Sequence, residues 1–352
     1  MRTLSQRNRP VVDLRSPAAR QAQHEPVWFR FLVIAAALLE PVPAAAAPAP
    51  LPLRAQLEAF QALDARVQSI GWRLIRSNAA YCRTVSPRIG LTVFDAAGFA
   101  DPAAVRAALG LPGDIAVEAV AADSPAARAG LHFGQPLRAV AGQAVESLPA
   151  AGPNDYARLV ALHDRIDAAL VASGKVAVTV GRGTDGQITG EPVCITRFEL
   201  LSSGSKAAAD GKRVVIGRKL VEAFPEEELL AAALAHELAH NLLGHRARLD
   251  ASGRSWSKVR ATEREADRLS VWLLANAGYD PMAAVRFFER WGPKFDLGIL
   301  ATPDHDGWKA RVKLVAAEIE MVEAARGSDR KADWQGIFAA PQPQTSAKTS
   351  TK

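Results

Sequence analysis

The stretch His236-Glu237-Leu238-Ala239-His240 constrains this chain most, because it lies inside the apolar run Leu229–Leu243, which is typical of a buried helix. Residues four apart share one face of a helix, so the two imidazoles can bind one metal ion. Glu237 follows the first histidine and is placed to act as a base on a water molecule bound to that metal. The pattern therefore predicts a helix that holds a catalytic zinc ion.

A second acidic pair can complete the metal site. The segment 257–277 has helical periodicity, and Glu263 and Asp267 share one of its faces. Catalytic zinc sites with two histidines commonly take a carboxylate as third ligand and leave one position for water. We expect Glu263 to bind zinc and Asp267 to hold the outer nitrogen of a ligating histidine. The alternative is a solvated face paired with neighbouring arginines, and Glu265 is expected at the surface.

The order of these motifs resembles a family of zinc metallopeptidases that includes HtpX, the CAAX prenyl endopeptidases, the mitochondrial Oma-type protease and soluble periplasmic quality-control proteases. The resemblance covers residues 214–325 and implies a mainly helical, gluzincin-like domain, placed here at 205–330. It also implies one Zn²⁺ per chain and protein or peptide substrates. The residues that carry it are His236–His240, Gly244-His245, Glu263–Arg268, Ala277–Pro281 and Phe287-Phe288.

A further histidine lies in the segment 302–311, which resembles the family's Thr-His-Pro segment although Asp306 replaces the proline. The resemblance implies that His305 approaches the zinc cleft and stabilises an oxyanion or fills the open metal position. His305 could equally cap a helix that starts near Asp306. Arg311 is a candidate for orienting the site, and His245 is expected to be structural or exposed rather than a ligand.

Residues 86–198 differ in residue pattern from the zinc segment, because short runs of β-branched residues alternate with Gly and Pro. This pattern predicts a small mixed α/β domain. The string Val117–Leu131 resembles a bacterial PDZ domain, although Gly134-Gln135 and Ala141-Gly142 depart from the turns of that family.

The PDZ-like resemblance implies a groove between the strand after Arg88-Ile89-Gly90 and a helix that carries Leu159, His163 and Ile166. A C-terminal peptide could add there as an extra strand. The alternative is a spacer or lid. His163 is expected to be a surface or groove histidine rather than a ligand.

The N-terminus has the composition of an export signal. Scattered arginines precede the apolar run Phe31–Leu39, which is too short to span a bilayer comfortably, and small residues follow it. We predict a signal peptide with a basic leader at 1–47, an exported protein that is periplasmic or secreted, and no stable transmembrane span in the mature chain. The alternatives are an N-terminal membrane anchor facing the periplasm and a start codon assigned too far upstream.

Two cysteines, Cys82 and Cys194, lie in the exported part. Such a pair can form one disulfide in an oxidising compartment, and two buried free thiols are the alternative. A helix is predicted at 53–80 and a disordered tail at 340–352. The net charge is +6, but the basic residues form no stripe interleaved with aromatic residues, so no nucleic-acid partner is expected.

Together these patterns predict an α+β chain, in which a mainly helical, gluzincin-like zinc peptidase domain follows a small mixed α/β PDZ-like domain. The expected function is a zinc-dependent endopeptidase that cleaves envelope or misfolded proteins. The alternative function is a chaperone or adaptor that has a latent zinc site and binds envelope proteins through the PDZ-like groove.

Overall fold

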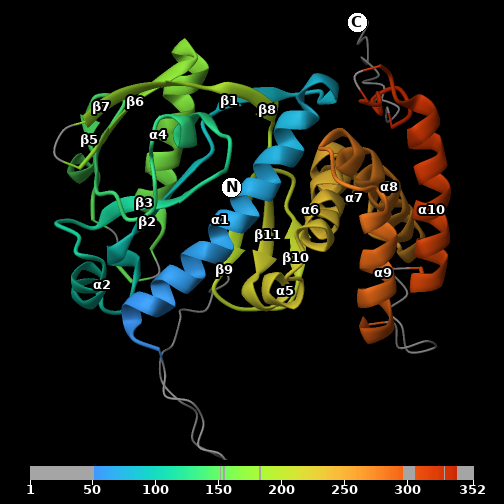
Figure 1. The fold of residues 1–352 in the computed structure, drawn as a ribbon, viewed down its shortest axis with the longest axis horizontal. Helices are drawn as coiled ribbons and strands as arrows, with labels where there is room; N and C mark the ends of the chain where they lie inside the picture. The colour runs from blue at the N-terminus through green and yellow to red at the C-terminus, as the bar shows by residue number, and fades with distance from the viewer. Residues whose placement is uncertain are drawn as a thin grey trace, which may run out of the picture.

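The computed structural model describes residues 51–150, 152–153, 155–181, 184–295, 306–328 and 330–338, which form an α+β fold (Figure 1). The signal peptide predicted at 1–47 and the tail predicted at 340–352 lie outside the described residues. None of the helices within these described ranges has the length and apolar content needed to cross a bilayer.

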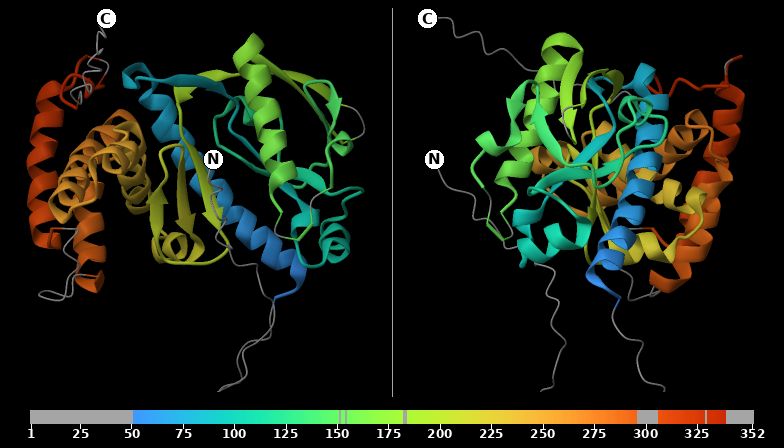
Figure 2. Two further views of the ribbon diagram at one scale, coloured as in Figure 1. Left: turned by 180° about the vertical axis from the view of Figure 1, so that it is seen from behind. Right: turned by 60° about the vertical axis from the view of Figure 1, so that its left-hand side comes forward.

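Helix α1 (Leu53–Ser77) runs diagonally between a β-rich part, residues 85–194, and a helical part, residues 197–338 (Figures 1 and 2). Its residues Val67, Ile70 and Leu74 are at most 1% exposed and belong to the largest apolar core, which lies in the helical part. At Gly71 a Cβ atom would lie 2.3 Å from the Phe198 ring. Glycine is therefore required there for α1 to approach the sheet of the helical part.

The β-rich part has its own apolar core, in which Leu162, Ile166 and Leu170 of helix α4 pack against the strands. Its helices are α2 (Pro102–Leu109), α3 (Pro125–Arg128) and α4 (Ala157–Ser173). Its antiparallel strand pairs are β1 (Val85–Arg88) with β8 (Glu191–Cys194), and β2 (Leu91–Asp95) with β3 (Ile115–Val120). A third sheet has the order β5-β4-β6-β7, formed by Gln143–Ala144, Leu137–Val140, Lys175–Val180 and Thr184–Thr189.

The helical part begins with a three-stranded sheet of order β10-β11-β9. Strand β11 (Arg213–Gly217) pairs in parallel with β9 (Arg197–Leu201) and antiparallel with β10 (Ala207–Ala209). The helices that follow are α5 (Arg218–Ala223), α6 (Glu227–Leu242), α7 (His245–Ser252), α8 (Trp256–Asn276), α9 (Met282–Phe295) and α10 (Trp308–Ala325).

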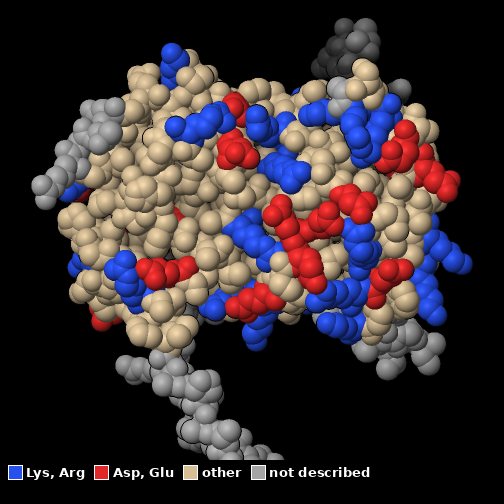
Figure 3. Space-filling view, in the orientation of Figure 1, with Lys and Arg blue, Asp and Glu red and all other residues tan. Residues whose placement is uncertain are grey.

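Helix α6 carries the His-Glu-Leu-Ala-His sequence. Glu226 is its N-cap, and Pro225 precedes the helix. The acidic N-terminus is tied to α9, because Arg286 pairs with Glu228 and Arg290 pairs with Glu226. In the view of Figure 3, acidic and basic side chains are interspersed over the helical part, at the right of the picture.

Cys82 and Cys194 form a disulfide, so the alternative of two free thiols is wrong. The bond joins the chain just beyond α1 to β8 and closes a loop across a sequence separation of 112 residues. The buried Asn78 lies close by. Its amide donates to Leu74 O and Leu273 O, and its carbonyl oxygen accepts from the amide of Asn276. The end of α1 is thus fixed to both parts.

Opening the disulfide should destabilise the protein, because the unfolded chain regains the freedom of a long loop. We expect Cys82→Ser to lower the free energy of unfolding by about 2–5 kcal/mol. Guanidinium denaturation followed by circular dichroism measures the change. Wild-type protein treated with a reductant is the control and should resemble the variant. Coincident transitions for oxidised and reduced wild type would contradict the expectation.

Two carboxyl groups lie where α1 packs against β3 and β9. Asp64 is 6% exposed, and burial raises its pKa to about 6, against a hydrogen bond from Gln68. Burial and the neighbouring Asp64 raise the pKa of Glu118 to about 8. The folded state therefore disfavours ionisation of both groups. The stability that their neutral forms contribute is fully present below about pH 4, and it is lost as the pH rises through about 6 for Asp64 and about 8 for Glu118.

Replacing Glu118 by glutamine should remove the part of this pH dependence that belongs to Glu118. We expect Glu118→Gln to match wild type near pH 4.5 and to exceed its unfolding free energy by about 1–3 kcal/mol near pH 8.5. Urea denaturation at both pH values measures the difference. Glu146→Gln, at an exposed position of the β-rich part, is the matched control. A constant difference between Glu118→Gln and wild type at both pH values would contradict the assignment.

Candidate metal centre

Three side chains bring their ligand atoms together between α6 and α8. His236, His240 and Glu263 each offer one donor atom, and these atoms lie within 4.8 Å of one another. The two Nε2 atoms of the histidines are 3.2 Å apart. The Glu263 carboxylate oxygens lie 3.3 Å from His236 Nε2 and 3.4 Å from His240 Nε2. The structure thus brings together the three residues that the sequence singles out as ligands.

The spacing of these atoms fits a tetrahedral ion. Donors about 2.0–2.1 Å from a zinc ion at the centre of a tetrahedron are separated by about 3.3 Å. The donor set of two imidazoles and one carboxylate is also one that catalytic zinc uses, with a fourth position left for water. The residues present therefore fit one zinc ion.

A carboxylate holds the outer nitrogen of the first histidine. His236 Nδ1 lies 2.9 Å from Asp267 Oδ1, and Asp267 is 1% exposed. Arg311 of α10 donates to both oxygens of Asp267, at 2.8 and 2.6 Å, and lies 3.9 Å from Glu263. Burial opposes ionisation of Asp267, yet Arg311 and His236 hold its pKa below the usual range. The acceptor Asp267 favours the tautomer of His236 that has its proton on Nδ1 and a lone pair on Nε2.

The centre has the electrostatics of a cation site. Burial disfavours a charged His236, but the close carboxylates of Asp267 and Glu263 outweigh burial and raise its pKa to about 10. A positive charge is therefore strongly stabilised between these carboxylates. A metal ion supplies such a charge at the same place, and it must displace the proton to bind.

His240, the second candidate ligand, has another histidine as its partner. His245, at the start of α7, places Nδ1 2.9 Å from His240 Nδ1 and Nε2 3.1 Å from Glu265 Oε2. Arg248 holds the same Glu265 oxygen at 2.6 Å. His245 is 1% exposed, and burial lowers its pKa to about 4, so the ring is neutral at pH 7. It lies outside the ligand trio and is buried rather than exposed.

Sequence reasoning missed the role of Glu265. Its side chain is 37% exposed, but it faces His245 and Arg248 rather than solvent alone. Gly244 is the sequence feature that could have revealed this role. Its left-handed backbone (φ 63°) lies between α6 and α7 and turns the chain back toward His240.

Glu237 is half-buried on α6, next to the first histidine. Among the described residues none forms a hydrogen bond or ion pair with its carboxylate. The predicted role of His305 cannot be placed, because this residue lies outside the described residues, whereas Asp306 pairs with Arg264.

The comparison with protein families adds an independent finding. Residues 204–256 match the model of Peptidase family M48. The match supports an M48 metallopeptidase that uses zinc, and the matched segment contains both histidines and Glu237. Glu263 lies beyond it, so its inclusion in the centre rests on the geometry described above. No curated protein matches the chain.

Removing the carboxylate ligand should abolish tight zinc binding. We expect Glu263→Ala to raise the zinc dissociation constant more than about 100-fold, because changes even to outer partners of zinc ligands cost 10–100-fold. Metal content after dialysis and competition with a chromogenic chelator measure the effect. Glu222→Ala, on the exposed side of α5, is the control. Stoichiometric zinc in dialysed Glu263→Ala would remove Glu263 from the ligand set.

Proposed function

We propose that the protein is a zinc-dependent endopeptidase that cleaves envelope or misfolded proteins. The observation that carries the proposal is the arrangement of His236, His240 and Glu263 around one point, with Glu237 next to His236 in the sequence of the same helix. The M48 match over residues 204–256 agrees with this chemistry.

His236, His240 and Glu263 would hold the ion. When bound, zinc lowers the pKa of a water molecule toward neutrality and polarises the scissile carbonyl. Glu237 accepts the proton from the attacking water and later donates it to the departing amine, so the product is a cleaved peptide. Asp267 and Arg311 keep His236 in the tautomer that binds metal.

Strand β10 offers a place for an extended substrate. It pairs with β11 on one side, and no other strand in the described part of the chain pairs with it. It also contacts α6, and Gly211 N in the turn after it donates to Asn241 Oδ1 on that helix at 2.7 Å. A substrate that added to the open edge of β10 would gain main-chain hydrogen bonds beside the zinc helix.

The β-rich part is proposed to be a PDZ-like module that binds peptides or regulates access. Support comes from β2, which pairs with β3 alone among the described strands and contacts α4. Ion pairs span this region at both ends. Arg158 on α4 binds Asp95 at the end of β2, and Arg88, before β2, binds Asp167 of α4. A peptide that entered between β2 and α4 would have to compete with these pairs.

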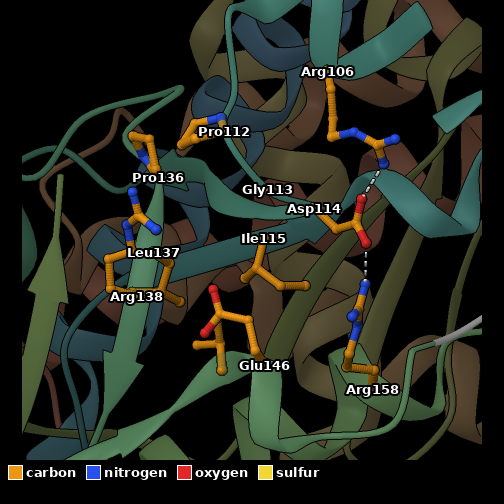
Figure 4. A pocket seen from close by; sticks show the side chains of 11 residues that line it. Arg106, Pro112, Gly113, Asp114, Ile115, Pro136, Leu137, Arg138, Glu146 and Arg158 are labelled. Atoms are coloured by element: carbon orange, nitrogen blue, oxygen red, sulfur yellow. Dashed lines mark hydrogen bonds and ion pairs between the residues drawn. The ribbon is translucent and has the colours of Figure 1, made fainter. Parts of the chain in front are cut away.

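A cavity of about 310 Å³ lies near the N-terminal end of α4 (Figure 4). Asp114 lies between Arg106 and Arg158 on its wall, at 2.5 and 3.1 Å. Ile115 and Leu137 add apolar surface. The mixed lining is suited to a short polar segment of a peptide, and its ion pairs leave little net charge to attract a nucleic acid.

An exported, periplasmic or secreted location is proposed from residues 1–47. The disulfide between Cys82 and Cys194 supports it, because such bonds persist in oxidising compartments. An uncleaved N-terminal anchor that faces the periplasm would leave the two cysteines in the same compartment.

The decisive variant is Glu237→Gln, which keeps the shape of the side chain and removes its basicity. We expect it to bind zinc like wild type and to digest unfolded casein at least about 100-fold more slowly, since a general base contributes 10²–10⁴-fold. Casein fragments on gels measure the rate, and chelation followed by added zinc should abolish and restore wild-type activity. Glu289→Gln, at an exposed position of α9, is the control. Equal rates for Glu237→Gln and wild type would exclude the mechanism.

The same digest separates the enzyme from the alternative of a chaperone or adaptor with a latent zinc site. An adaptor would retain casein on a column and leave it intact, whatever the zinc content. Retention without cleavage by wild type, together with no effect of Glu237→Gln, would favour the adaptor.

A further inference from the structure

The two ligand histidines have different partners at the nitrogen that points away from the metal site. Nδ1 of His236 contacts the carboxylate of Asp267. Nδ1 of His240 contacts another imidazole, because His245 Nδ1 lies 2.9 Å from it. An imidazole can either donate or accept at this contact, so the contact alone leaves the tautomer of His240 undetermined.

Glu265 removes that ambiguity. Its Oε2 lies 3.1 Å from His245 Nε2, and an ionised carboxylate only accepts hydrogen bonds. His245 therefore carries a proton on Nε2. Its Nδ1 is the acceptor, because a proton there would make His240 Nδ1 accept and would leave the proton of His240 on the Nε2 that must bind the metal. His240 Nδ1 is then the donor, and His240 Nε2, which faces Glu263, keeps its lone pair.

We propose that His245 and Glu265 are positioning residues that fix His240 in its metal-binding tautomer. The chain of contacts runs from Arg248 through Glu265 and His245 to His240. The proposal rests on the zinc site of the proposed function and does not require that the protein cleave peptides.

The fold fixes the members of this chain by burial and charge. His245 is 1% exposed, and its ring lies edge-on to that of His240 with a centroid distance of 4.8 Å. Arg248, one turn further along α7, holds Glu265 on α8 at 2.6 Å. Helix α7 therefore contributes to the centre without supplying a ligand.

Zinc affinity measured by chelator competition tests the proposal in four variants: Glu265→Ala, His245→Phe, the double variant and Arg246→Ala. We expect each of the first two to weaken zinc binding about 10–100-fold. The double variant should be no weaker than His245→Phe alone, because Glu265 acts through His245. Arg246, the exposed neighbour on α7, is the matched control and should leave affinity unchanged.

Additive losses in the double variant would overturn the proposal, because they would mean that Glu265 acts by its charge and not through His245. Affinity within about twofold of wild type in Glu265→Ala would also overturn it. If His245→Phe fails to fold, Glu265→Ala still decides the outcome when compared with Glu265→Asp, which should recover part of the lost affinity.

Nitrogen-15 NMR of histidine in the zinc-free protein gives a second readout that a purely structural role would not move. We expect His240 to be protonated on Nδ1 in wild type and to populate both tautomers in Glu265→Ala. Protonation of His240 on Nε2 in wild type would overturn the proposal. A wild type that binds zinc tightly but leaves casein intact would refute the peptidase function and leave this assignment standing.

Discussion

The contact between α6 and α8 is the one on which the metal centre depends, because it sets two histidines of one helix against a carboxylate of the other. Ala231, Ala235 and Ala239, each four residues from the next, are fully buried on α6. Leu238 and Leu273 lie in the same core, and burying such a side chain contributes about 2 kcal/mol. Apolar packing therefore brings the two helices together, and the polar partners of the ligands then orient their side chains.

Next to that contact, ion pairs between α10 and α8 neutralise two buried carboxylates, one on each helix. Arg311 binds Asp267, and Glu318, seven residues along the same face, binds Arg268 and the indole nitrogen of Trp272. Asp267 and Glu318 are 1% and 2% exposed, and a buried charge without a partner costs several kcal/mol. Helix α10 is thus part of the centre in an electrostatic sense, and it keeps Asp267 ionised behind His236.

Helical periodicity predicted which residues share a face within α6 and within α8, and the preference of zinc for a carboxylate as third ligand pointed to Glu263 as the partner of His236 and His240. Periodicity also placed Glu265 on another face of α8, correctly, but it could not reveal what covers that face. The cover is α7, a short helix that was not predicted and that exists because Gly244 reverses the chain. The order β10-β11-β9 was equally beyond prediction, since pairing between strands depends on contacts distant in sequence.

The link between the two parts of the molecule passes through the elements next to the centre. Arg197 of β9 pairs with Asp167 of α4, the same carboxylate that Arg88 binds before β2. Any displacement of α4 must therefore break the pair with Arg197 or move β9. Strand β9 is hydrogen-bonded to β11, which leads directly into α5 and then α6. The disulfide Cys82–Cys194 joins the two ends of the β-rich part next to α1, so this part meets the helical part through α1, β9 and their ion pairs.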